Sequence, residues 1–217
     1  MLQKIKAIAI LILALGLSIV VGFKLKLSID DYKQRIIKEN FLAAYSEINR
    51  DISNNGYGDY VSNIENYVAT EGSTIAIINM EDINLSVSVV EGVSKEDIKL
   101  NVGHYPQSDM PWVAGGNFAV AGHSSIVYNK LFNNLHDAKV GMNVEVVTSF
   151  GNYYYEIVDR YVVEPTDVSC IERNKYGKNT ITMTTCINSG KQRLIVVGEM
   201  KKASEIELEK LLKEMEQ

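Results

Sequence analysis

Short runs of β-branched and aromatic residues, separated by turn-forming residues, constrain the fold more than any other feature of this chain. Such runs favour extended strands, and they lie at residues 74–78, 85–89, 117–123, 144–148, 153–163, 180–185 and 193–200. The runs do not alternate with helix-length segments, as they would in a doubly wound sheet. The pattern predicts a mainly β protein, an antiparallel barrel of about eight strands with short helices.

The N-terminal region predicts a membrane anchor. Residues 7–23 carry no charge, and seventeen helical residues at about 1.5 Å each reach the short end of a membrane-spanning length. A cleaved secretory signal is the alternative, but residues 20–24, Val-Val-Gly-Phe-Lys, fit a cleavage site poorly. Lysines flank the run on both sides, at positions 4, 6, 24 and 26, and the first two favour a cytoplasmic N-terminus.

Helical patterns flank the predicted barrel. Ser28 can cap a helix over residues 28–53, in which apolar residues recur at spacings of three and four: Ile37, Phe41, Tyr45, Ile48 and Ile52. A break separates it from a second short helix over residues 59–69. Residues 204–207, Ser-Glu-Ile-Glu, match a capping box at the start of an amphipathic tail helix. The predicted divisions are an anchor at 1–27, a helical stalk or cap at 28–71, a barrel at 72–200 and a helix at 201–217.

The bulk composition narrows the partners. A formal net charge of -5 argues against a nucleic-acid partner. The chain has two cysteines, Cys170 and Cys186, and an even number outside the cell ordinarily indicates a disulfide. Because Cys186 stands where chemistry is expected, we predict two free thiols. The three histidines and two cysteines include no close pair of ligands, so no zinc site is predicted.

The reactive candidates are Cys186 and Arg193. Cys186 ends a β-rich run, turn-forming residues follow it, and Arg193 begins the next run. A thiol beside a fixed cation has a lowered pKa and is a better nucleophile at neutral pH. Arg193 keeps its charge and can hold an oxyanion or a substrate carbonyl. The alternative is a small buried hydrophobic residue followed by a solvated strand residue.

These residues carry a resemblance to a known family. Residues 182–186, Thr-Met-Thr-Thr-Cys, resemble the T-L-x-T-C signature of sortases, with Met183 in place of Leu. Arg193 fits the Arg that sortases carry on the next strand, and residues 117–124, Asn-Phe-Ala-Val-Ala-Gly-His-Ser, resemble the segment that carries their His. The resemblance covers about residues 72–200 and includes residues 165–168, Pro-Thr-Asp-Val, a turn seen in some class A sortases.

The resemblance implies a closed sortase-type barrel and a cysteine transpeptidase at the cell wall of a Gram-positive bacterium. It assigns catalysis to His123, Cys186 and Arg193, without a metal or an organic cofactor. Cys186 would cleave a signal similar to Leu-Pro-x-Thr-Gly in surface proteins through a thioester. His123 would serve as acid and then as base, because an imidazole titrates near neutrality. The acceptor would be the amine of a lipid-linked peptidoglycan precursor. The resemblance also implies a single-pass membrane protein whose catalytic domain is extracytoplasmic.

The resemblance also implies a substrate groove. Thr185 is expected to orient the reacting groups, and the groove wall maps onto Ala121, Thr184, Val168 and Cys170. For Cys170 the alternative is a reversible disulfide with Cys186 that switches the enzyme off. We predict the lining role.

The loops and flanking segments indicate which class of sortase the chain resembles. The segment 163–179 lacks the long helix of class B sortases. Class C sortases have a lid before the barrel and a second membrane segment after it, and the sequence shows no pattern for either. A class A-like enzyme is predicted, with class B, D or E as alternatives. Two other functions stay open, a thiol hydrolase that releases peptide and a catalytically silent membrane-anchored binding barrel.

Overall fold

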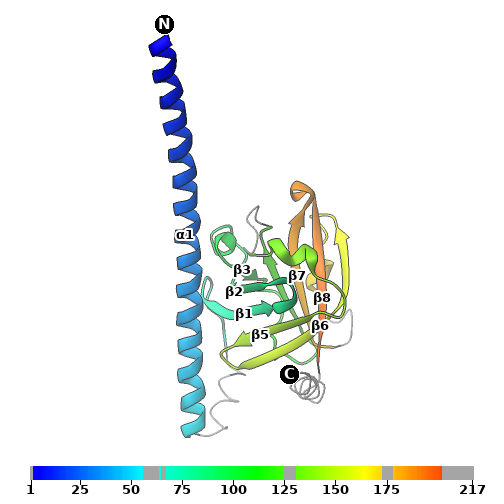
Figure 1. Ribbon diagram of the computed structural model, residues 1–217. Coiled ribbons are helices and arrows are strands. Elements are labelled where there is room, and N and C mark those ends of the chain that lie inside the picture. The colour runs from blue at the N-terminus through cyan, green and yellow to red at the C-terminus, as the bar shows by residue number, and fades with distance from the viewer. Residues whose placement is uncertain (1, 56–63, 65–66, 125–130, 173–177, 202–217) are drawn as a thin grey trace, which may run out of the picture.

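The computed structural model describes residues 2–55, 64, 67–124, 131–172 and 178–201. Helix α1 (Leu2–Asn55) runs along the outside of a closed barrel, and its N-terminal part extends beyond the barrel (Figure 1). The strands are β1 (Thr74–Met80), β2 (Leu85–Glu91), β3 (Val102–His104), β4 (Asn117–Gly122), β5 (Asn143–Thr148), β6 (Gly151–Val163), β7 (Thr180–Ile187) and β8 (Gln192–Met200). Between them lie short 3-10 helices, of which η2 (Asp97–Lys99), η3 (Asn133–Asp137), η4 (Ser169–Ile171) and η5 (Asn188–Gly190) are used below.

The predicted closed barrel is confirmed. Its strands follow the order β1-β2-β3-β4-β7-β8-β6-β5 around the barrel. Most neighbours are antiparallel, but β2 pairs with β3, and β4 with β7, in parallel. The second parallel pair arises because β5 and β6 pair elsewhere before the chain returns along β4, which a hairpin could not achieve.

Two apolar layers cover opposite faces of β7 and its neighbours. Alternate residues of a strand point to opposite faces, and Ile181 and Met183 lie in the barrel interior. On the outer face, a second cluster, called the outer cluster here, consists of Ala119, Cys170, Ile171, Ile195 and Val197. The segment around η4 therefore lies over one part of the barrel wall.

Helix α1 docks on the barrel through one face. Phe41, from the predicted apolar stripe, is buried with Ile77 and Val147. The Gln34 side-chain amide donates to the Leu100 carbonyl (2.5 Å), and the Lys38 ammonium donates to the Ser86 hydroxyl (3.0 Å). In Figure 1 the turn between β7 and β8 lies at the end of the barrel that points toward the N-terminal part of α1.

The prediction of a helix that starts at Ser28 was wrong. Ser28 lies inside the continuous α1, and its hydroxyl donates to the Lys24 carbonyl (3.1 Å). No Gly or Pro interrupts the chain between these residues and residue 53, so the apolar N-terminal helix continues unbroken. The short helices predicted along with the strands are 3-10 helices in the described residues, among them η3. Most of the predicted helix at 59–69 and most of the predicted tail helix at 201–217 lie outside the described residues.

Candidate active site

The strand register brings the three predicted catalytic residues to one rim of the barrel. In the parallel pair of β4 and β7, Gly122 lies opposite Thr185, so His123 follows at the edge that Cys186 reaches. In the antiparallel pair of β7 and β8, Cys186 lies directly opposite Arg193. His123 is exposed, whereas Cys186 and Arg193 are half-buried. A peptide can therefore approach all three side chains from solvent.

The turn between β7 and β8 positions the guanidinium. Asn188, Ser189 and Gly190 have φ angles of 50°, 57° and 83°. This left-handed conformation costs Gly190 little and strains Ser189. The Arg193 guanidinium donates from Nη1 to the carbonyl oxygens of Gly190 (3.0 Å) and Gln192 (3.3 Å). Arginine has five N–H donors, so the turn can fix the side chain and leave donors for a substrate.

A residue that lines the substrate groove must lie on the same face of the barrel wall as Cys186. Period-two alternation places Thr182, Thr184 and Cys186 on the outer face of β7, opposite to the interior residues. Ala121 lies opposite Thr184 in the register, and Cys170 belongs to the outer cluster. Val168 precedes η4 and is 62% exposed. The structure thus gathers Ala121, Thr184 and Cys170 on the predicted side.

Thr185 lies on the other face of β7. It is buried, and its hydroxyl donates to the Gly122 carbonyl (2.8 Å). This bond ties the end of β7 to the end of β4, immediately before His123. Its side chain therefore suits a positioning role. By contrast, Thr184 is 7% exposed, and its hydroxyl has no hydrogen-bond partner among the described residues. A buried hydroxyl without a partner costs about 1–3 kcal/mol.

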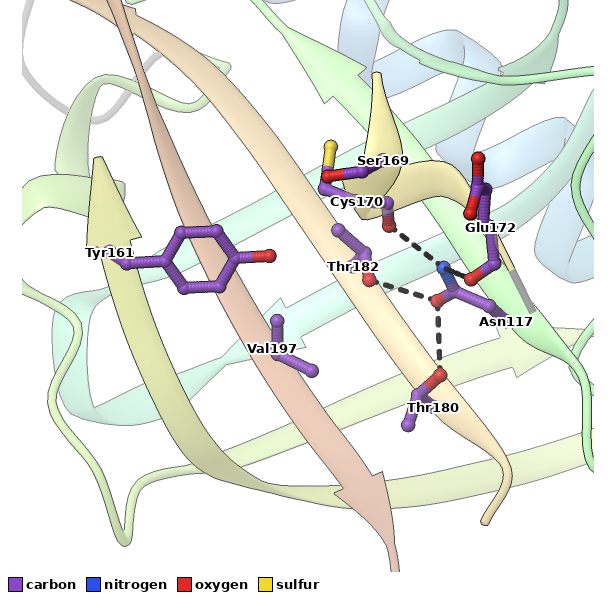
Figure 2. Close-up of a pocket in the computed structure, with 8 residues that line it drawn as sticks. All are labelled: Asn117, Tyr161, Ser169, Cys170, Glu172, Thr180, Thr182 and Val197. Atoms are coloured by element: carbon purple, nitrogen blue, oxygen red, sulfur yellow. Dashed lines mark hydrogen bonds between the residues drawn. The ribbon is translucent and has the colours of Figure 1, made fainter. Parts of the chain in front are cut away.

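Sequence reasoning missed Asn117, which clamps the η4 segment to the barrel (Figure 2). Its side-chain Oδ1 accepts hydrogen bonds from the hydroxyls of Thr180 (3.1 Å) and Thr182 (2.9 Å). Its Nδ2 donates to three carbonyls of the covering segment, those of Cys170 (3.0 Å), Ile171 (3.2 Å) and Glu172 (3.3 Å). The sequence held one indication, a polar residue at the start of an apolar strand.

Tyr105 is a second residue without a sequence-based role. It follows β3, its N–H donates to the Ala119 carbonyl (3.0 Å), and its ring packs on the outer cluster. Burial raises the pKa of the Tyr105 hydroxyl above its ordinary value. The Cys170 thiol raises this pKa further, Arg193 lowers it, and the Cys186 thiol raises it again. A tyrosine with a raised pKa is protonated at neutral pH, so Tyr105 offers a neutral donor beside the rim.

His104 is buried and is not part of the exposed rim. It is 1% exposed, stacks on Phe118 with ring centroids 5.0 Å apart, and has its Nδ1 2.7 Å from Glu91 Oε2. Cys170, which is buried, and Cys186, which is half-buried, do not form a disulfide with each other. Within the described residues, no group of three or more His, Cys, Asp and Glu side chains could hold a metal ion.

A thiol, an imidazole and a guanidinium at one rim of a closed barrel define a site that can carry out nucleophilic acyl transfer. A family model described as the sortase domain matches residues 78–201, more than half of the chain. The chain belongs to the sortase family, whose members are transpeptidases.

Individual relatives agree with this assignment. The chain is 28% identical to Sortase D of Bacillus subtilis over 89% of its own length and 97% of that protein. It is 24% identical to Sortase A of Listeria monocytogenes over 97% of its length and 96% of that protein. A solved Sortase D5 transpeptidase from Clostridium perfringens superimposes with a TM-score of 0.60 at 28% identity, covering 75% of this chain and 98% of that one.

Proposed function

We propose that this sortase cleaves a sorting signal similar to Leu-Pro-x-Thr-Gly and transfers the new carboxyl end to the amine of a lipid-linked peptidoglycan precursor. The observation that carries the proposal is the strand register. It sets Cys186 opposite Arg193, and it brings the end of β4, which His123 follows, next to the end of β7. The substrates are surface proteins with a C-terminal sorting signal. The enzyme acts outside the membrane, with its N-terminus in the cytoplasm.

The reaction uses two acyl transfers. The Cys186 thiolate attacks the Thr–Gly carbonyl carbon, a C–S bond forms, and the carbonyl electron pair moves onto oxygen. When the oxyanion collapses, the C–N bond breaks and protonated His123 gives its proton to the leaving amine. The acceptor amine then attacks the thioester, neutral His123 takes the surplus proton, and Cys186 leaves. One imidazole serves both steps because each leaves it in the state that the next requires.

Two donors support the oxyanion. Arg193 lies opposite the nucleophile and donates without losing its charge. The Tyr105 hydroxyl, which its raised pKa keeps protonated, is the second donor, because the Tyr105 ring packs on the outer cluster that includes Ile195 of the strand that carries Arg193. Donors fixed before the reaction stabilise the developing charge more strongly than mobile water does.

The remaining residues shape the groove. Ala121 and Thr184 form its floor beside Cys186, and Val168 and Cys170 form the wall that Asn117 fixes. Thr185 holds the ends of the two parallel strands together. Cys170 serves as a lining residue, not as the partner of a disulfide.

The relatives favour class D over the class A-like enzyme that the sequence suggested. The Sortase D of Bacillus subtilis and the Sortase D5 of Clostridium perfringens each share 28% identity, against 24% for the Sortase A of Listeria monocytogenes. The turn at residues 165–168 is thus a weaker guide to class than the chain as a whole.

The test is product analysis on a panel of five-residue sorting peptides, with and without an added amine. We expect an acyl-enzyme of increased mass on Cys186 and, with amine, a ligated product. Cys186→Ala should lose the adduct and the product while keeping the thermal unfolding temperature. Cleaved peptide that never joins the amine would favour the thiol hydrolase. A wild-type chain that neither binds a covalent adduct nor cleaves any peptide would favour the silent binding barrel.

A further inference from the structure

A cleft between α1 and the barrel lies apart from the reactive rim. Its volume is about 550 Å³, and it is lined by Gly22, Leu25, Lys26, Ile29, Asp30 and Lys33 of the helix and by Lys99 and Leu100 of the barrel. A hydrogen bond from the Gln34 side chain to the carbonyl of Leu100, a lining residue, joins the helix to the barrel. The cleft therefore has two walls, one from the anchor helix and one from η2.

The cleft begins where the candidate membrane-spanning segment ends. The uncharged run of residues 7–23 includes Gly22, which lines the cleft, and the side chains of residues 4–26 are exposed. Helix α1 is long and apolar enough to cross a membrane. With this run in the bilayer, the cleft opens at the level of the lipid headgroups.

The lining combines positive charge with exposed apolar surface. Lys26, Lys33 and Lys99 contribute three ammonium groups against the single carboxylate of Asp30. Leu25 is 61% exposed and Ile29 is 45% exposed, although both lie beyond the uncharged run. Apolar side chains beside cations match the boundary between a phosphate headgroup and its acyl chains. A soluble anion would gain nothing from the leucine and the isoleucine.

We propose that this cleft binds the phosphate of an anionic phospholipid, held by Lys99 of the barrel together with Lys26 and Lys33 of α1. The proposal rests on the membrane location of residues 7–23 and not on the peptide chemistry. The bound lipid would bridge the helix and η2, and so brace the barrel against the bilayer. Lys99 makes the site specific, because an ordinary basic segment beside a membrane helix would need no residue from the barrel.

The size of the effect can be estimated from charge. A lysine near an anionic membrane surface contributes about 1 kcal/mol, which corresponds to about fivefold in affinity. Removing the Lys99 charge should therefore weaken lipid retention about fivefold. High salt should weaken retention as well, since partly exposed charges are screened.

The experiment is native mass spectrometry of the full-length protein released from nanodiscs that contain phosphatidylglycerol and phosphatidylcholine in equal amounts. We expect the wild type to retain one phosphatidylglycerol in clear excess over phosphatidylcholine. Lys99→Gln should lower that retention about fivefold. Lys24→Gln is the matched control, because Lys24 lies at the same end of the uncharged run but does not line the cleft.

The remaining outcomes overturn the proposal. Equal losses in the Lys99 and Lys24 variants would mean general charge attraction, and no preference for phosphatidylglycerol would mean no site. Displacement of the lipid by millimolar inorganic phosphate would mean a free-anion site. Cleavage of a soluble sorting peptide should be the same in wild type and Lys99→Gln, so a failure of the lipid site is distinguishable from a failure of the proposed reaction.

Discussion

The outward-facing side chains at the two ends of strand β7 differ in their hydrogen bonding. At its start, the hydroxyls of Thr180 and Thr182 are bound by Asn117, which also holds the covering segment. At its end, Cys186 lies opposite Arg193, the exposed His123 follows the neighbouring end of β4, and the Thr184 hydroxyl has no partner among the described residues.

The difference separates stability from reactivity along one strand. Polar groups that are fully bonded stabilise the fold and rigidify their surroundings. A buried polar group without a partner, such as the Thr184 hydroxyl, costs stability, whereas the exposed His123 and the half-buried Cys186 remain open to a substrate. The start of β7 should therefore respond to mutation in unfolding experiments, and its end should respond in kinetic ones.

Arg193→Lys should give the largest effect at the reactive end. We expect kcat/KM for peptide cleavage to fall about 10²–10³-fold, because a flexible ammonium cannot keep the fixed geometry of a guanidinium donor. Unfolding should stay near that of the wild type. The control is Arg160→Lys, since the Arg160 guanidinium donates to the His136 carbonyl (3.2 Å), outside the rim. Near-wild-type kinetics for the Arg193 variant would remove it from the site.

Asn117→Ala should give the largest effect at the bonded end. It removes five hydrogen bonds and leaves two hydroxyls and three carbonyls without their partner. We expect a loss of about 3 kcal/mol in unfolding free energy, measured by thermal or denaturant unfolding. Asn152→Ala, which removes an exposed amide bonded to Glu145, should change little. Equal stability of the two variants would contradict the clamp.

Tyr105→Phe tests the reactive end while keeping the ring. Loss of a secondary oxyanion donor should lower kcat about tenfold and leave KM and unfolding nearly unchanged. The pH profile should keep its shape, since the raised pKa keeps this phenol protonated. Tyr161→Phe is the matched control, because Tyr161 packs on the same outer cluster. If both variants behave alike, Tyr105 serves packing alone.

Thr184→Val and Thr182→Val should shift stability in opposite directions. The first substitution replaces an unpartnered hydroxyl with a methyl group, so unfolding free energy should rise by about 1 kcal/mol while KM for the sorting peptide increases. Thr182→Val removes a hydroxyl bonded to Asn117 and should lower stability with KM unchanged. The measurements are thermal unfolding and steady-state cleavage. Destabilisation by both substitutions would show that the Thr184 hydroxyl is satisfied in solution.

Calcium should have the smallest effect, none at all. Some class A sortases are activated by calcium, but that ion needs about six oxygen ligands, several of them charged. Here Asp109 is the one carboxylate in the approach to His123, and its Oδ2 accepts from the Asn117 N–H (3.1 Å). Turnover should match in millimolar calcium and in chelator. Severalfold activation that disappears in Asp109→Asn would show that Asp109 belongs to a calcium site.

The sequence predicted the barrel because strand periodicity and turn residues are local features. It named His123, Cys186 and Arg193 as candidates because their motifs occur in family order, and the register places them at neighbouring strand ends. It could not predict the parallel pair of β4 and β7, since pairing between distant strands depends on the path of the chain through β5 and β6. The hydrogen bond from Thr185 to the Gly122 carbonyl depends on the same pairing, because it can form only when β4 lies beside β7.

Asn117 and Tyr105 escaped prediction for a different reason. Each acts through groups far away in the sequence, Asn117 through η4 and Tyr105 through β7 and β8. The continuous helix escaped because a serine flanked by charges suggests a cap, although the serine hydroxyl can equally bond to the preceding turn.

The unbroken helix α1 determines both the distance of the barrel from the uncharged run and its orientation around the helix axis. From Lys24 to the docking residue Lys38 it rises about 21 Å, at 1.5 Å per residue. The turn between β7 and β8 points back toward the N-terminal part of that rod (Figure 1). With the anchor in a bilayer, a sorting signal is met close to the membrane that its own protein is leaving. One residue inserted between Lys24 and Gln34 would swing the barrel by about 100° around the rod while lifting it by only about 1.5 Å.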